Sequence, residues 1–266
     1  MCGIVGFTGR ENALPILIKG LYSLEYRGYD SAGIAAFTKD GLRVVKTRGR
    51  IANLEEKIRE EGELSCTCGI GHTRWATHGE PSDRNSHPHL GGRDGKGKVA
   101  VVHNGIIENY KELRERLEAH GYTFQSETDT ETVAHLVDYL HTGKQEDLAK
   151  TVLEAVQRIR GSYALGVVSM DNPEEIVAAR RDNPLVIGVG EGENMIASDI
   201  TAIIGRTKKY IILDDNEVAI VRPDSVVVMN EFGDVVEKQI QTVNWDLSAA
   251  EKGGYQHFML KEIMEQ

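Results

Sequence analysis

Short apolar segments separated by turn signals fill the second half of the chain, and they constrain its fold more than any other feature. Between residues 161 and 240 these segments are GSYALGVVSMD, EEIVAAR, PLVIGVG, NMIASD, YIILDDNEVAIVR and SVVVMNEFGDVVEKQI. Runs of this length with Gly, Asn and Asp between them are typical of successive strands in an antiparallel sheet. The second half therefore predicts antiparallel strands and not a parallel wind of alternating strands and helices.

The first half mixes strands with helices. It opens with a short buried strand, CGIVGFTG, and an amphipathic helix within residues 12–28 that ends at Gly28. Further segments are predicted as a hairpin over 31–49 with a Lys-Asp-Gly turn, a helix over 51–62, a strand beginning near Cys66, a strand ending at Asn104-Gly105, and helices at about 108–120, 129–141 and 146–160. This order of strands, helices and strands predicts an α+β fold in which two packed antiparallel sheets lie between helices.

Composition excludes several classes of protein. The net charge of −10 over 266 residues disfavours a nucleic-acid partner, which requires a basic face. No stretch approaches the ~18 apolar residues of a membrane span, and there is no secretory signal pattern, so no membrane partner is expected. Three unevenly spaced cysteines do not form a disulfide framework, which fits a cytoplasmic location.

Cys2 carries two functional groups if Met1 is removed, a thiol and a free α-amino group. The thiolate is the attacking form of cysteine. An α-amino group, with a pKa of about 7.7–8.0, is a suitable general base near neutral pH. The alternative is a small side chain at the start of a buried strand, where cysteine behaves as a hydrophobe.

Three further motifs each allow a functional and a structural interpretation. In GHTRWATHGEP, the guanidinium of Arg74 could bind a carboxylate, or it could lie on a solvated loop. In HNG, Asn104 and Gly105 could form an oxyanion hole, or they could be a hairpin turn. In SETDTE, Asp129 opens a helix that Thr128 and Glu131 cap, so its carboxylate could bind an ammonium group or simply favour the helix dipole.

The histidines and the Gly-rich segment give weaker signals. His72, His78, His87, His89 and His103 lie in a loop-rich stretch, but neither H-E-x-x-H nor C-x-x-C occurs, so no metal site is predicted. Gly188 and Gly190 form G-x-G without a third glycine or a following helix, which indicates a sheet turn and not a dinucleotide site.

Taken in order along the chain, the motifs MCGIVGF, LEYRGYDSAGIA, GHTRWATHGEP, VVHNGIIENY and GYTFQSETDTE resemble the class II glutamine amidotransferases. Their combination is similar to the glutaminase part of the glutamine–fructose-6-phosphate aminotransferases. The resemblance covers residues 2–266. It implies the N-terminal-nucleophile fold, a four-layer αββα sandwich of two antiparallel sheets between helix layers.

The resemblance also implies roles for the site residues. Cys2, freed by removal of Met1, would attack the side-chain amide of L-glutamine, and Asn104 with the Gly105 N–H would form the oxyanion hole. Substrate-binding positions would be Arg74 for the α-carboxylate, Asp129 for the α-amino group, and Thr77 and His78 in the same loop. Trp75 would gate the path of ammonia, and Arg27 and Gly28 would lie near the nucleophile. No cofactor is implied.

The resemblance further implies a domain of residues 2–242 and a segment, 243–266, that leads to a sugar isomerase half outside this chain. The tail YQHFMLKEIMEQ is helical in pattern and lacks a cap, as expected for a piece of a longer protein. The full enzyme would be a homo-oligomer that passes ammonia to fructose 6-phosphate. Three alternatives stay open, namely the glutaminase part of another class II amidotransferase, a non-catalytic amino-acid-binding module, and a fold-related hydrolase of other amides.

Overall fold

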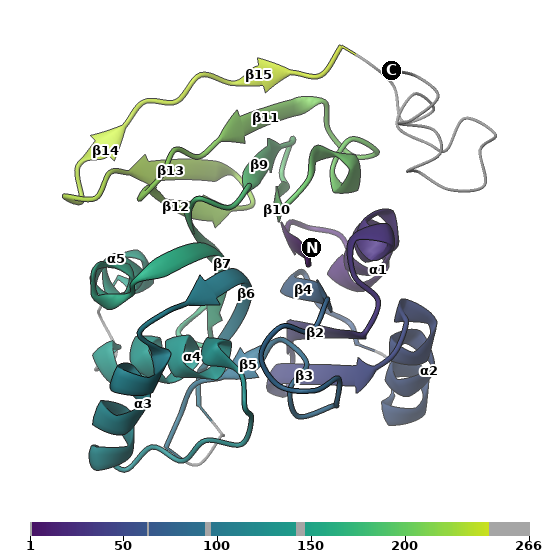
Figure 1. The fold of residues 1–266 in the computed structure, drawn as a ribbon. Helices are drawn as coiled ribbons and strands as arrows, with labels where there is room; N and C mark the ends of the chain where they lie inside the picture. The colour runs from purple at the N-terminus through teal and green to yellow at the C-terminus, as the bar shows by residue number, and fades with distance from the viewer. Residues whose placement is uncertain (1, 63, 94–96, 142–146, 245–266) are drawn as a thin grey trace, which may run out of the picture.

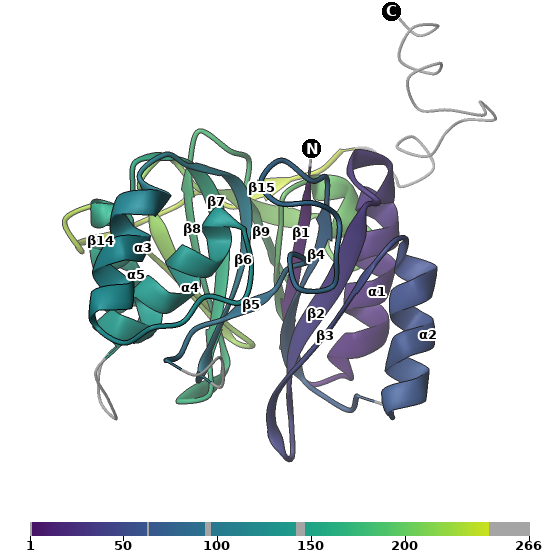
Figure 2. The same cartoon turned by 60° about the horizontal axis from the view of Figure 1, so that its bottom comes forward.

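Two antiparallel sheets pack face to face, and helices cover the outer face of each sheet (Figures 1 and 2). The computed structural model describes residues 2–62, 64–93, 97–141 and 147–244. The expected α+β, four-layer arrangement of helices, sheet, sheet and helices is thereby confirmed.

The first sheet has eight strands in the order β15-β11-β9-β10-β1-β4-β2-β3. Its strands are β1 (Gly3–Thr8), β2 (Ser31–Thr38), β3 (Gly41–Arg48), β4 (Cys68–Arg74), β9 (Val186–Val189), β10 (Asn194–Ala197), β11 (Lys209–Ile212) and β15 (Gln241–Thr242). Its outer face is covered by α1 (Ala13–Leu24) and α2 (Ile51–Glu61). The 3₁₀ turns η1 (Glu25–Arg27) and η2 (Ile200–Ala202) adjoin it.

The second sheet has seven strands in the order β14-β13-β12-β8-β7-β6-β5. Its strands are β5 (His89–Leu90), β6 (Val99–Ile107), β7 (Gly161–Ser169), β8 (Asn172–Arg181), β12 (Val218–Arg222), β13 (Ser225–Met229) and β14 (Val235–Val236). Its outer face carries α3 (Tyr110–Ala119), α4 (Asp129–Leu140) and α5 (Leu148–Arg158).

The four layers enclose three apolar cores, and β1 shows how one strand serves two of them. Alternate side chains of a strand point to opposite faces. Ile4 accordingly packs in the core between the sheets, while Val5 and Phe7 pack in the core beneath α1. A strand buried on both faces is a continuous apolar run, which is why this segment could be recognised from sequence.

Most predicted elements are confirmed, and three are corrected. SVVVMNEFGDVVEKQI is not one strand but the paired strands β13 and β14, with a turn at Gly233 (φ 87°) between them. YIILDDNEVAIVR is not one strand: β11 ends at Ile212, the chain turns through Asn216 (φ 67°), and β12 belongs to the other sheet. The strand before Asn104-Gly105 does not end there but continues to Ile107, paired with β7 throughout. The predicted helix in the tail lies outside the described residues.

Four buried histidines lie close together, and two of them, His89 and His103, contact Thr128 and Thr130 at the start of α4. His72 is on β4, His103 is on β6, and His87 and His89 lie in the segment that leads into and begins β5. The ring of His87 lies 4.2 Å from that of His72 and 5.1 Å from that of His89, centroid to centroid. Burial lowers the pKa of His72 to about 3 and holds the pKa of His87 and His89 well below the ordinary value.

These histidines predict a pH-dependent stability. Below pH ~6.5 the histidines of the unfolded chain bind protons that the buried neutral rings of the folded protein do not. The free energy of unfolding therefore decreases as the pH is lowered, by about 1.4 kcal/mol per pH unit for each such ring. We expect urea unfolding at pH 7.5, 6.5 and 5.5 to show this loss. His87→Phe should reduce the slope of unfolding free energy against pH by the equivalent of about one proton. A substitution of the exposed His120 should leave this slope unchanged. A stability that is flat over this range would contradict the prediction.

Candidate active site

The predicted site residues come from both sheets and meet at one end of the sandwich. β1 and β4 are antiparallel with Gly3 opposite Thr73, so Cys2 lies beside Arg74 at the end of β4. From the other sheet, the side-chain amide of Asn104 on β6 donates to the backbone carbonyl of Cys2 at 3.0 Å. Asp129 begins α4, which packs on β6.

The Cys2 thiol is held by the backbone of Trp75. Its Sγ accepts from the Trp75 N–H at 3.2 Å and lies 3.5 Å from the Trp75 carbonyl, to which the thiol can donate. Burial raises the pKa of the Cys2 thiol, and this effect outweighs the opposing effect of the Trp75 N–H. The sulfur therefore rests as a thiol at neutral pH, and its activation requires a base.

The turn that presents the Trp75 N–H is held in place by hydrogen bonds to Asp30, in the segment after η1. The Asp30 carboxylate accepts from the Ala76 N–H at 2.9 Å, and the Asp30 N–H donates to the Arg74 carbonyl at 3.0 Å. A Cβ on Gly28 would lie 3.0 Å from the carbonyl carbon of Arg74 and from the nitrogen of Trp75. Glycine at position 28 thus permits a close backbone approach beneath the nucleophile.

Asn104 and Gly105 lie inside β6, which pairs with β7 on both sides of them, so the hairpin-turn interpretation is wrong. Asn104 is buried, and its Oδ1 lies 3.0 Å from Nε2 of His72. Gly105 has a φ of +133°, and a Cβ there would lie 2.1 Å from the Ser162 carbonyl oxygen. Only glycine fits this backbone, which leaves a side-chain amide and a main-chain N–H on consecutive residues.

Arg74 is not on a solvated loop, because its side chain is buried. Its Nη2 donates to the backbone carbonyls of His78 and Gly79 and so closes the loop 74–79. Nη1 is buried and has no hydrogen-bond partner among the described residues. A buried guanidinium with a free nitrogen is suited to an anion such as a carboxylate.

Asp129 is buried at the first position of α4, where its charge is also favourable to the helix dipole. One carboxylate oxygen accepts from the Ile107 N–H at 2.8 Å, which ties the helix to the end of β6. The second oxygen has no hydrogen-bond partner in the described ranges. It could therefore accept from a ligand without loss of the contact to β6.

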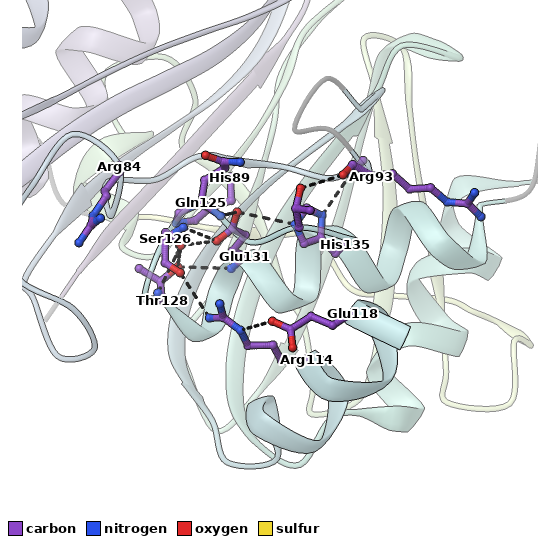
Figure 3. A network of polar contacts seen from close by, with 12 residues as sticks. Arg84, His89, Arg93, Arg114, Glu118, Gln125, Ser126, Thr128, Glu131 and His135 are labelled. Carbon is purple, nitrogen blue, oxygen red and sulfur yellow. Dashed lines mark hydrogen bonds and ion pairs between the residues drawn. The ribbon is translucent and has the colours of Figure 1, made fainter. Parts of the chain in front are cut away.

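A buried carboxylate, Glu131, anchors the start of α4 (Figure 3). It accepts from the backbone N–H groups of Gln125 (2.8 Å) and Ser126 (2.7 Å) and from the Ser126 hydroxyl (2.6 Å). Burial acts to raise the pKa of Glu131, but nearby His135 and the Ser126 and Gln125 donors outweigh it and hold the pKa below its ordinary value. The predicted cap from Thr128 to the Glu131 N–H is present at 3.4 Å.

The remaining predicted residues lie around this centre. Trp75 is exposed beside Tyr29, with ring centroids 5.8 Å apart. Thr77 is exposed in the loop, and the ring of His78 meets Tyr110 edge-on. Arg27 forms an ion pair with Asp199 at 3.1 Å and so lies beside β10.

Sequence reasoning assigned no role to Asp30 or His72, and it gave Glu131 only as part of the helix cap. Asp30 stands in the segment LEYRGYDSAGIA and Glu131 in the capping motif, so both were within recognised motifs. Nothing local in the sequence distinguishes His72 from the other histidines. Its partner Asn104 is 32 residues away, and only the packing of the two sheets brings them together.

The described part of the chain offers no group of three His, Cys, Asp or Glu side chains placed to hold a metal ion. Cys66 and Cys68 are buried free thiols. None of the helices within the described ranges is long and apolar enough to cross a membrane.

Comparisons with known proteins identify the family of this chain. Over all 266 residues the chain is 53% identical to the isomerizing glutamine–fructose-6-phosphate aminotransferase of Clostridium tetani and 50% identical to that of Aquifex aeolicus. The chain spans 43–44% of the length of these relatives.

Among solved structures, glutamine phosphoribosylpyrophosphate amidotransferase from B. subtilis matches with a TM-score of 0.72 and 28% identity. That match covers 88% of this chain and 50% of the other protein. A family model described as a glutamine amidotransferase domain matches residues 72–205, about half of the chain. This protein therefore belongs to the glutamine amidotransferase domain family.

Proposed function

We propose that this chain hydrolyses the side-chain amide of L-glutamine to glutamate and ammonia, with Cys2 as the nucleophile. The observation that carries the proposal is the 3.0 Å hydrogen bond from the Asn104 amide to the carbonyl of Cys2. It joins an oxyanion donor on one sheet to the nucleophile residue on the other. A module that only binds amino acids would require neither group.

Removal of Met1 supplies the base that the Cys2 thiol needs. Because burial raises the pKa of this thiol, little thiolate is present at neutral pH. The freed α-amine of Cys2 has an ordinary pKa of about 7.7–8.0 and accepts the thiol proton as the sulfur attacks.

The reaction then runs through two covalent steps. Sulfur bonds to the amide carbon, and the carbonyl oxygen becomes an oxyanion that the Asn104 amide and the Gly105 N–H stabilise. The amide nitrogen takes the proton from the α-ammonium and leaves as ammonia, and a thioester remains. Water, deprotonated by the α-amine, attacks the thioester, releases glutamate and returns the proton to sulfur.

Charge complementarity selects glutamine. The free Nη1 of Arg74 binds the α-carboxylate, and the free oxygen of Asp129 binds the α-ammonium group. Thr77 and His78 belong to the loop that Arg74 closes, and they cover the substrate. Trp75 gates the exit of ammonia, while Arg27 and Gly28 support the backbone beneath the nucleophile.

In the whole protein, we propose that residues 2–242 form the glutaminase domain and 243–266 lead to a sugar isomerase half. Relatives that are 50–54% identical over the whole chain carry the name glutamine–fructose-6-phosphate aminotransferase, so fructose 6-phosphate is the proposed acceptor of ammonia. The proposed assembly is a cytoplasmic homo-oligomer without a cofactor or nucleic-acid partner.

Cys2→Ala should lower glutamine hydrolysis by about a thousandfold or more, because it removes the nucleophile. A glutaminase assay that measures released glutamate checks this. The matched control is Cys66→Ala, which removes a buried thiol far from Asn104 and should keep activity. In the unmodified protein, an electrophilic glutamine analogue should add once, on a Cys2 that mass spectrometry shows to be the first residue. An adduct on Cys66 or Cys68 alone would refute the assignment.

Asp129→Asn should raise the KM for glutamine by about 10- to 100-fold, since hydrogen bonds to charged groups contribute about 1.5–3 kcal/mol. The asparagine oxygen can still accept from the Ile107 N–H, so the fold is kept. The ratio of kcat/KM for glutamine to that for its des-amino analogue glutaramate should fall close to one in the variant. Asp138→Asn, on the same helix but bonded to Tyr122, is the control and should leave KM unchanged. An unchanged preference in Asp129→Asn would exclude this role.

A further inference from the structure

We propose that His72 is a positioning residue that orients the Asn104 amide for stabilisation of the oxyanion. The proposal rests on the proposed glutaminase function. His72 lies on β4 and is fully buried. Its Nε2 lies 3.0 Å from Oδ1 of Asn104 and 3.0 Å from the carbonyl oxygen of His103.

The orientation of the amide follows from its fixed neighbours. The Cys2 carbonyl can only accept, so the group of Asn104 that faces it must be the NH₂. The amide oxygen therefore faces His72. Since this oxygen and the His103 carbonyl are both acceptors, Nε2 of His72 must carry the hydrogen and donate it. One imidazole N–H thus holds the amide and the backbone just before it.

The ring of His72 has little freedom to release this contact. His87 stacks on it at 4.2 Å with the ring planes 32° apart. Gly33 stands opposite His72 in the pairing of β2 with β4, and a Cβ there would lie 2.2 Å from the His87 carbonyl oxygen. The absence of a side chain at Gly33 lets the His87 segment press against His72. His72 Nδ1 is buried without a hydrogen-bond partner among the described residues, as suits a neutral Nε2–H ring.

The consequence concerns the transition state and not substrate binding. The NH₂ of Asn104 has two hydrogens, and one goes to Cys2 O. With Oδ1 held by His72, the second hydrogen keeps one direction and is available to the developing oxyanion. Without the donor, the amide can rotate, and stabilisation of the oxyanion is lost while Arg74 and Asp129 still bind the substrate.

The test is a double-mutant cycle on glutamine hydrolysis. His72→Phe keeps a planar ring and should lower kcat by about 10- to 100-fold, with KM within about threefold, since loss of a whole oxyanion donor costs about 10²–10³. In an Asn104→Ala background the same substitution should cost less than about threefold. An equal loss of kcat in the wild-type and the Asn104→Ala backgrounds would overturn the proposal, and so would a rise in KM with kcat unchanged.

Three further measurements separate positioning from a purely structural role. Alkylation of Cys2 by iodoacetamide forms no oxyanion, so its rate should be unchanged in His72→Phe. His87→Phe keeps the stacked ring, removes no contact to Asn104 and should retain kcat. His72→Gln can place an N–H near Nε2 and should restore much of kcat, whereas the shorter His72→Asn should not. The comparison of His72→Gln with His72→Asn tests the proposal even if His72→Phe does not fold. A kcat of His72→Gln that does not exceed that of His72→Asn would contradict the proposal.

A spectroscopic readout is independent of catalysis. Long-range ¹H–¹⁵N spectra of the unmodified protein should show His72 protonated at Nε2 only, without titration between pH 8 and 5. A His72 protonated at Nδ1, or one that titrates in this range, would refute the positioning role. Absence of glutamine hydrolysis by the unmodified protein would instead refute the proposed function, so the two failures are distinguishable.

Discussion

The face-to-face packing of two antiparallel sheets is the constraint on which the candidate site depends. Cys2 enters β1 beside the end of β4, and Asn104 lies on β6 of the opposing sheet. Neither sheet alone brings Cys2 near the side-chain amide of Asn104. The cores on the outer faces hold each sheet against its helices, and the core between the sheets sets their separation. The geometry of the site is therefore as rigid as the packing beneath it.

Buried polar groups hold together the end of the sandwich that carries the candidate site. Glu131 accepts three hydrogen bonds at the start of α4 and so locates Asp129, while the Asp129 carboxylate bonds back to the Ile107 N–H. A buried carboxylate is tolerated only when its acceptors are filled, and Glu131 meets that condition. On the other side, Asp30 fixes the turn that presents the Trp75 N–H to Cys2. The candidate site residues Asp129 and Trp75 thus each have a carboxylate nearby that holds their backbone in place.

Several parts of this picture could be predicted from sequence, and the failures have physical reasons. The period of apolar residues located α1, α2, α4 and α5 because each buries one face on a sheet. YIILDDNEVAIVR was misread as one strand because a turn at Asp215-Asn216 leaves the apolar pattern on both sides intact. The Asn104-Gly105 pair has the composition of a hairpin turn, yet pairing with β7 keeps it extended. Local propensity was overruled there by tertiary hydrogen bonds.

By itself the sequence determined the alternation of strands and helices, the thiol at position 2, the cap at Thr128 and the family, because these features are local patterns or ordered motifs. Only the tertiary structure decided which groups meet. It paired Asn104 with Cys2 and His72, left one nitrogen of Arg74 without a described partner, and buried four histidines close together. Such contacts join residues from 32 to more than 100 positions apart, and no periodicity encodes them. They arise when two sheets bury their apolar faces against each other. This packing fixes the relative positions of the polar side chains at the end of the sandwich where the candidate site lies.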